Sequence, residues 1–237
     1  MENKLYDKFL FNFLARDARN AADIMEAGNG YVVPGIVSDD FASVDEAITR
    51  VQELKRVTDT VSIGLGGGGN IENWKKVLEI SVGSEPGHLN QPFEKATYSK
   101  GFLEGNNIDG QLVNALVKPS GEVGKIQLIS GAVMPVEEFL EIAVALGIES
   151  IKMMPVKGRF HLEELIYLTE KAAAEGIRGI EPAGGIDASN IKQMIDSVKE
   201  IDIEFFMPHI FGSTIDKHTG LTIPSKVNEI LNALEGY

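Results

Sequence analysis

The chain alternates short apolar runs with longer stretches in which apolar positions recur at helical spacing. The runs at residues 31–37, 61–65, 178–183 and 204–210 are each followed by such a stretch. A short apolar run followed by helical periodicity predicts a β-strand followed by an α-helix. The sequence Ser43-Val-Asp-Glu46 is a capping box that starts the helix after the first of these runs. The pattern therefore predicts repeated βα units.

The N-terminal stretch has a different pattern. Apolar positions here are Leu10, Phe11, Phe13, Leu14, Ala21, Ala22, Ile24 and Met25. This spacing predicts an amphipathic helix from residue 1 to about residue 27, which Gly28 and Gly30 end. We therefore expect residues 1–29 to form a helical extension.

The middle of the chain is less regular. Residues 88–91 predict a short strand, residues 93–104 a helix, and residues 113–118 and 126–130 two more strands. The last two strands are joined only by the short link KPSGEVGK. Parallel neighbours need a crossover of about a dozen or more residues, so this pair could instead form a hairpin.

The regular alternation of strand and helix patterns returns after Pro135. It predicts a helix to Leu146, a strand that contains Lys152 and a helix from 161 to 175. The segments ALGIESIK, ending at Lys152, and AEGIRGIE, ending at Glu181, share a pattern one βα unit apart. About eight strands alternate with helices, which predicts one (β/α)8 TIM barrel domain over residues 1–237, extended by the helix at 1–29. A doubly wound open sheet is the alternative. The even period of the last units, without a long crossover, favours the barrel.

Charge and composition narrow the classes of partner. The chain has 22 basic and 35 acidic residues, and its net charge of −13 opposes binding to nucleic acid or to an anionic membrane. It lacks an apolar run of about eighteen residues, and its N-terminus is unlike a secretory signal, so we expect a cytoplasmic protein. The absence of cysteine excludes disulfides, thiolate metal sites and a cysteine nucleophile.

Lys152 is a cation inside the apolar run 148–154, just before Pro155. Burial disfavours the charged form of lysine and lowers its pKa, so that a neutral amine becomes available to attack a carbonyl group. This position therefore suggests Schiff-base chemistry. The alternative is a lysine at a strand edge or subunit contact, whose stem covers apolar surface while its head reaches water.

Other candidate residues follow the predicted strands, where barrels place their active sites. Gly184 and Gly185 follow one late strand, and Gly212 and Ser213 follow the next, a placement that favours a phosphate site. Lys118 ends an apolar strand before a proline, as Lys152 does. It is a second candidate nucleophile or a ligand for a substrate carboxylate.

Other motifs point to no cofactor. The glycines at 66–69 form either an anion-binding loop or a flexible link, and they match neither a P-loop nor a dinucleotide fingerprint. The four histidines lack close ligand spacing, so we interpret each as a packing or surface residue and predict no metal. They are His88, His161, His209 and His218.

Three segments of the chain resemble the class I 2-dehydro-3-deoxyphosphogluconate aldolases. They are Ile151-Lys-Met-Met-Pro155, Glu181-Pro-Ala-Gly-Gly-Ile186 and Ile210-Phe-Gly-Ser213. The resemblance covers residues 126–215, and the chain looks like the divergent branch associated with glucosaminate 6-phosphate breakdown. It implies a Schiff base on Lys152, phosphate loops at Gly184, Gly185, Gly212 and Ser213, no cofactor, a phosphorylated keto-acid substrate and a homo-oligomer.

The chain also departs from that family's pattern. The better-known branch has a glutamate as proton shuttle and an arginine as carboxylate ligand on its second strand, whereas residues 61–69 contain neither. We therefore take Glu181 as the candidate base, because its side chain should face the barrel interior near Lys152. Glu181 could instead be a salt-bridge partner that holds Lys152 in place. Lys118 becomes the candidate carboxylate ligand.

The resemblance implies cleavage of 2-dehydro-3-deoxy-6-phosphogluconate to pyruvate and glyceraldehyde 3-phosphate through a Schiff base. Two alternatives remain open. One is a sugar-phosphate isomerase or epimerase, with Glu181 and an aspartate as bases and Lys152 as an electrostatic aid. The other is a non-catalytic sugar-phosphate binding protein on the same barrel, because a fold does not determine a function.

Overall fold

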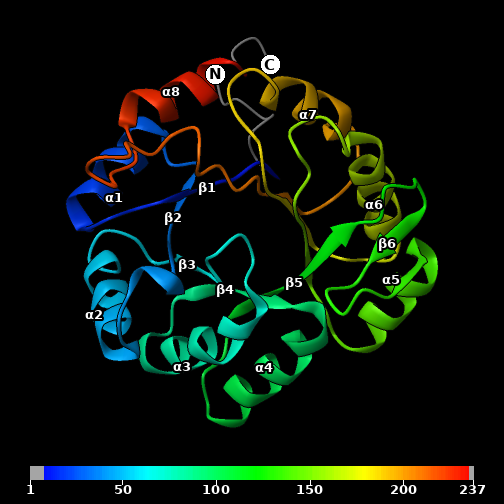
Figure 1. The fold of residues 1–237 in the computed structure, drawn as a ribbon, viewed down its shortest axis with the longest axis horizontal. Helices are drawn as coiled ribbons and strands as arrows, with labels where there is room; N and C mark the ends of the chain where they lie inside the picture. The colour runs from blue at the N-terminus through cyan, green and yellow to red at the C-terminus, as the bar shows by residue number, and fades with distance from the viewer. Residues whose placement is uncertain (1–7, 235–237) are drawn as a thin grey trace.

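The computed structural model describes residues 8–234 of the chain, which form a ring of strands surrounded by helices (Figure 1). The strands are β1 (Phe11–Leu14), β2 (Val32–Val37), β3 (Val61–Gly64), β4 (Gly87–Pro92), β5 (Leu112–Pro119), β6 (Lys125–Gln127), β7 (Val133–Pro135), β8 (Ser150–Met153), β9 (Gly179–Pro182) and β10 (Phe205–Phe206). The helices are α1 (Ala18–Ala27), α2 (Val44–Leu54), α3 (Trp74–Ser84), α4 (Phe93–Gly105), α5 (Val136–Ala145), α6 (Leu162–Ala174), α7 (Ile191–Val198) and α8 (Pro224–Asn232). Two short 3₁₀ turns cover Ser38–Asp40 and Ile71–Asn73.

Eight of the strands form a closed parallel barrel. Their order is β1-β2-β3-β4-β5-β8-β9-β10, and every neighbouring pair in this order is parallel. The last strand region returns to the first: the Asn12 amide donates to the Pro208 carbonyl at 2.9 Å, and the Ile210 amide donates to the Asn12 carbonyl at 2.9 Å. This closure confirms the predicted (β/α)8 barrel and excludes the open sheet.

The predicted helix within residues 1–29 is confirmed at Ala18–Ala27 and is wrong at the described residues before it, and this helix belongs to the first βα unit of the barrel. Residues Phe11–Leu14 form β1, which pairs with β2, and the helix begins only at Ala18. Phe11 and Phe13 are fully buried, and the Asp17 carboxylate caps α1 by accepting from the Asn20 amide. A short apolar run fits a strand as well as a buried turn of helix, so spacing alone misassigned it. Residues 1–7 lie outside the described part.

The segment after β5 forms a hairpin, which was the alternative to a parallel pair of strands. β6 pairs antiparallel with β5, and β7 pairs antiparallel with β6. The barrel neighbour of β5 is therefore β8, which carries Lys152. The prediction of a barrel strand at residues 126–130 is therefore wrong, and β1 completes the set of eight barrel strands.

The barrel interior contains an unusual number of polar side chains, where branched apolar residues are the common filling. The buried polar residues on the barrel strands and their extensions include Asn12, Ser62, His88, Asn90, Asn114, Ser150, Lys152, Glu181 and His209. Apolar side chains on the opposite faces, such as Ile63, Leu89 and Ile151, pack in the hydrophobic core. Because buried polar groups are costly unless they are paired, this interior layer marks a candidate site.

Candidate active site

Lys152 lies on β8, the sixth strand of the barrel ring, between Leu116 of β5 and Glu181 of β9. Its side chain is only 5% exposed, and strand alternation turns it to the barrel interior while Ile151 packs in the core. Lys152 lines a cavity of about 240 Å³. The other lining residues are Leu14, Val37, Gly64, Leu65, Gly66, Gly67, Gly68, Gly69, Asn90, Leu116, Met154 and Phe211.

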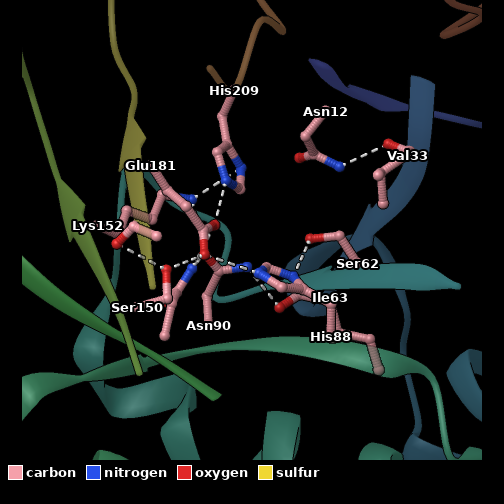
Figure 2. Close-up of polar contacts among 12 residues, drawn as sticks. Asn12, Val33, Ser62, Ile63, His88, Asn90, Ser150, Lys152, Glu181 and His209 are labelled. Carbon is pink, nitrogen blue, oxygen red and sulfur yellow. Dashed lines mark hydrogen bonds and ion pairs between the residues drawn. The ribbon is translucent and has the colours of Figure 1, made fainter. Parts of the chain in front are cut away.

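Two neutral acceptors hold the Lys152 nitrogen. Nζ donates to Asn90 Oδ1 at 2.7 Å and lies 3.1 Å from Nδ1 of His209 (Figure 2). Burial lowers the pKa of Lys152 to about 8, although the nearby Glu181 carboxylate acts in the opposite direction. At neutral pH about a tenth of the enzyme then carries the neutral, nucleophilic amine, a far larger fraction than for an ordinary lysine.

Glu181 is fully buried and accepts four hydrogen bonds. Oε1 contacts His88 Nε2 at 3.0 Å and accepts from Ser150 Oγ at 2.6 Å. Oε2 accepts from Asn114 Nδ2 and contacts His209 Nε2, both at 2.7 Å. Burial alone would raise the pKa of Glu181, but His88 and His209 outweigh it and hold this pKa well below its usual range.

His209 connects Glu181 to Lys152. Burial, followed by the Lys152 charge, lowers the pKa of His209 to about 3, so the ring is neutral near pH 7. A carboxylate only accepts hydrogen bonds, so the proton of this neutral ring is assigned to Nε2, which faces Glu181. Nδ1 is then an acceptor that faces the Lys152 nitrogen.

The structure thus brings the two predicted catalytic residues, Lys152 and Glu181, onto neighbouring strands at matching positions. They are joined through His209, and no direct ion pair connects them among the described residues. Glu181 does not line the cavity of Lys152.

Lys118 lies near the end of β5 and is exposed. It shares a strand face with Leu116, which lines the cavity, because the two residues are separated by one position. Within residues 8–234, its ammonium group has neither a hydrogen bond nor an ion pair. A free cation on this face of β5 is compatible with attraction of an anionic substrate.

The two late glycine loops lie side by side. Ser213 Oγ donates to the Ile186 carbonyl at 3.1 Å, which ties the loop after β10 to the loop after β9. Within the described residues, the backbone amides of Gly184, Gly185, Gly212 and Ser213 make no hydrogen bond, so they are available to an anion. These four residues do not line the Lys152 cavity, although Phe211, next to Gly212, does.

The glycines at 66–69 line the Lys152 cavity directly. Gly66, Gly67, Gly68 and Gly69 all have positive φ, from 52° to 91°, and the Gly69 and Asn70 amides both donate to the Gly66 carbonyl. This is one turn of left-handed backbone, and the amides of its first three glycines are unpaired within the described residues. Glycine is required because L side chains rarely adopt this backbone conformation.

A second cavity of about 530 Å³ shares Leu14 and Val37 with the Lys152 cavity. Arg16 and Arg50 line it together with Asp40 and Glu46. It therefore offers cations beside the Lys152 cavity, with acidic residues among them.

Sequence reasoning missed Asn90, Asn114, Ser150, His88 and His209, which surround Lys152 and Glu181. The available signal was a polar residue at an inward position of an otherwise apolar strand, as in the segment 88–91. Within the part of the chain that the structure describes, no cluster of three or more His, Asp or Glu side chains is arranged to hold a metal ion. None of the helices in that part is long and apolar enough to cross a membrane.

The fold and the site together define a (β/α)8 barrel protein with a cavity that is lined by a buried amine. Residues 5–218 match the sequence model of the KDGP aldolase family. The chain belongs to this family and is therefore an aldolase, a carbon–carbon lyase.

The relatives agree with this assignment. The chain is 33% identical over 234 residues to a 2-dehydro-3-deoxy-phosphogluconate aldolase of Salmonella typhimurium (strain 14028s / SGSC 2262), covering 94% of each chain. Among solved structures, thiamine phosphate pyrophosphorylase from Pyrococcus furiosus has a TM-score of 0.60 at 11% identity, covering 98% of each chain. The aldolase QR15 has a TM-score of 0.54 at 14% identity, covering 99% of this chain and all of its own. At these identities the two structures support the fold alone.

Proposed function

We propose that the protein cleaves 2-dehydro-3-deoxy-6-phosphogluconate to pyruvate and glyceraldehyde 3-phosphate through a Schiff base on Lys152. The observation that carries this proposal is the buried Lys152 nitrogen in the cavity, with its pKa lowered to about 8. The name of the Salmonella relative supports the substrate, because that protein is described as a 2-dehydro-3-deoxy-phosphogluconate aldolase.

In this proposal the neutral Lys152 amine attacks the C2 ketone and, after loss of water, forms an iminium ion. A base takes the proton of the C4 hydroxyl, the C3–C4 bond breaks, and its electrons flow into the iminium to give an enamine. Protonation of the enamine at C3 and hydrolysis of the resulting iminium release pyruvate and restore Lys152. No redox partner is needed, because electrons only move within the substrate and the imine.

The substrate carboxylate has two candidate ligands. The left-handed turn at residues 66–69 lines the cavity and has three unpaired amides, an arrangement that suits an anion. Lys118 is the second, as a free cation on the inward face of β5. We assign the direct contact to the turn and the attraction of the substrate to Lys118, because Lys118 is exposed and does not line the cavity.

The substrate phosphate is assigned to the paired loops with Gly184, Gly185, Gly212 and Ser213, whose amides are unpaired. Binding energy gained there would position the reacting carbons at Lys152. The cavity with Arg16 and Arg50 is the alternative location. A homo-oligomer is part of the proposal on the family resemblance, and light scattering of the purified protein tests it.

The experiment for the Schiff base is intact-mass spectrometry after incubation with pyruvate and sodium borohydride, followed by peptide mapping. We expect a reduced pyruvyl adduct on Lys152 in the wild-type protein and none in Lys152→Met, which should keep the fold and lose turnover by about 10⁴-fold or more. An adduct on Lys118 would move the nucleophile. The absence of any adduct would favour the isomerase or binding-protein alternatives.

A further inference from the structure

Lys152 Nζ has two acceptors, and their number matters for its chemistry. A neutral amine has two N–H bonds and one lone pair, so Asn90 Oδ1 and His209 Nδ1 together use both hydrogens. The side-chain carbon of Lys152 occupies the third tetrahedral position of the nitrogen, so the lone pair must point along the fourth. The two acceptors therefore fix the orientation of the attacking electron pair.

Formation of the iminium changes this count. The iminium nitrogen is bonded to the substrate carbon and to the lysine stem, and it keeps a single N–H bond. One of the two acceptors is then released. Asn90 Oδ1 lies at the shorter distance, 2.7 Å against 3.1 Å, and its amide group is fixed because Asn90 Nδ2 donates to the Ile63 carbonyl at 2.9 Å.

We propose that His209 is a catalytic residue of the aldol cleavage, which orients the Lys152 amine before attack and acts as the base once the iminium has released it. This inference rests on the proposed Schiff base. His209 Nδ1 then takes the proton of the C4 hydroxyl, C3–C4 breaks, and C4 becomes the aldehyde carbon. The imidazolium returns the same proton to C3 of the enamine, so protons and electrons balance without another reactant.

Glu181 gives this role to His209 without touching the substrate. Its carboxylate accepts from His209 Nε2 at 2.7 Å, which sets Nδ1 as the acceptor, and its negative charge stabilises the imidazolium that forms during cleavage. Ser150 and Asn114 donate to the same carboxylate and fix its position. Neither Glu181 nor His209 lines the cavity, but His209 Nδ1 faces the Lys152 nitrogen, which does, whereas Glu181 is linked to that nitrogen only through His209. Glu181 is therefore a positioning residue.

The charged and titratable groups that face His209 are few. Lys152 contacts Nδ1, Glu181 contacts Nε2, and His88 lies across Glu181 with its ring 6.2 Å from that of His209. Phe211 packs edge-on against the other side of the ring at 5.9 Å. His88 contacts Glu181 as His209 does, yet within residues 8–234 no hydrogen bond joins it to Lys152, and so it provides a matched control.

Exchange of the pyruvate methyl protons in D₂O isolates the step assigned to His209. Pyruvate forms the iminium that follows cleavage and protonation of the enamine. A base must remove one of its C3 protons to return to the enamine, which NMR detects as deuterium incorporation. His209→Asn retains an acceptor near the former Nδ1 position but lacks a titratable group. We expect this variant to form the borohydride-trapped adduct within about tenfold of the wild-type rate and to lose methyl exchange by about 10²-fold or more.

His88→Asn disturbs the same carboxylate and is expected to lose much less exchange than His209→Asn. Exchange retained in His209→Asn, or equal losses in the two variants, would overturn the assignment. If His209→Asn does not fold, His209→Gln, which keeps the hydrogen bond to Glu181, must show the same loss of exchange. A wild-type protein without a pyruvate adduct would instead overturn the proposed function, and this inference with it.

Discussion

Glu181 illustrates how a residue type acquires its role from its surroundings. An exposed glutamate has water at both oxygens, whereas each oxygen of Glu181 accepts two protein hydrogen bonds. Its charge nevertheless reaches Lys152, where it raises the pKa against the larger effect of burial. The carboxylate therefore tunes the amine without contacting it.

Replacement of Glu181 by glutamine should lower the pKa of Lys152 below about 8. The new amide can present its oxygen to Asn114 and His209 and its NH₂ group to Ser150 and His88, since both of those can accept. The His209 tautomer is then kept, and only the charge that favours the ammonium is lost.

The pH dependence of the pyruvate–borohydride adduct rate measures this pKa. We expect the midpoint of Glu181→Gln to lie at lower pH than that of the wild type. An unchanged or higher midpoint would show that the Glu181 charge does not act on the amine.

Lys152 could be predicted from the sequence because it is a lone cation in an apolar run. Asn90 and His209 could not, since their contact with Lys152 joins β4, β8 and the segment after β10, and only the strand register brings these together. The same argument holds for Glu181. Its inward direction follows from strand alternation, but its four donors come from four different strand regions.

At the scale of elements, the loops after β8 and β9 depend on close backbone contact. The Gly158 amide donates to the Gly184 carbonyl, and the Val156 amide donates to the Ala183 carbonyl at 2.8 Å. A Cβ atom at Gly185 would lie 2.8 Å from the Gly158 amide nitrogen, and Gly185 has φ of +74°. Glycine is therefore required here by packing, in addition to any role in binding.

Gly185→Ala and Gly212→Ala should separate packing from phosphate binding. Gly185→Ala is expected to cost about 1–3 kcal/mol of unfolding free energy, because the backbone contact cannot yield and φ is positive. Gly212 has open space around its Cβ position, so Gly212→Ala should change stability by less than about 0.5 kcal/mol. Its methyl group would instead crowd the assigned phosphate and raise KM for the phosphorylated substrate.

Urea unfolding and steady-state kinetics of the two variants provide these measurements. The rate of pyruvate adduct formation in Gly212→Ala is the control, since pyruvate carries no phosphate. An unchanged KM in Gly212→Ala would move the phosphate to the cavity that contains Arg16 and Arg50.

The elements themselves were predictable to different degrees. The βα units after Pro135 followed from their spacing, whereas the short link after β5 left both a hairpin and a further barrel strand open. The N-terminal strand did not, because a four-residue apolar run has no distinctive period. Its identity as a strand comes from pairing with β2 on one side and with the region of β10 on the other.

At the scale of the whole molecule, the buried His209 couples the stability of the barrel to pH. In the unfolded chain a histidine takes up its proton near pH 6.5, whereas burial keeps His209 neutral in the fold down to about pH 3. The stabilising contribution is therefore present above pH 6.5 and is lost as the pH falls towards 3. The pKa of Glu181 is also lowered by folding, so its contribution to stability is lost as well when the pH falls, but only below its ordinary pKa of 4.5.

The unfolding free energy should consequently fall between pH 7 and pH 5 by about 2 kcal/mol on account of His209. Urea titrations at the two pH values measure the loss, and His209→Asn should show a loss smaller by about this amount. Equal losses in the two proteins would mean that His209 is not held neutral in the fold.

The barrel closes between Asn12 and His209, and this closure must come late during synthesis of the chain. These residues lie far apart in the sequence, so a ribosome must synthesise the chain through His209 before they can meet. Until then Lys152 remains in water with the ordinary pKa of 10.5 and is almost entirely protonated. A nascent or unfolded copy therefore has far less of the neutral amine than the folded protein, and the neutral amine is the form that the proposed Schiff base needs.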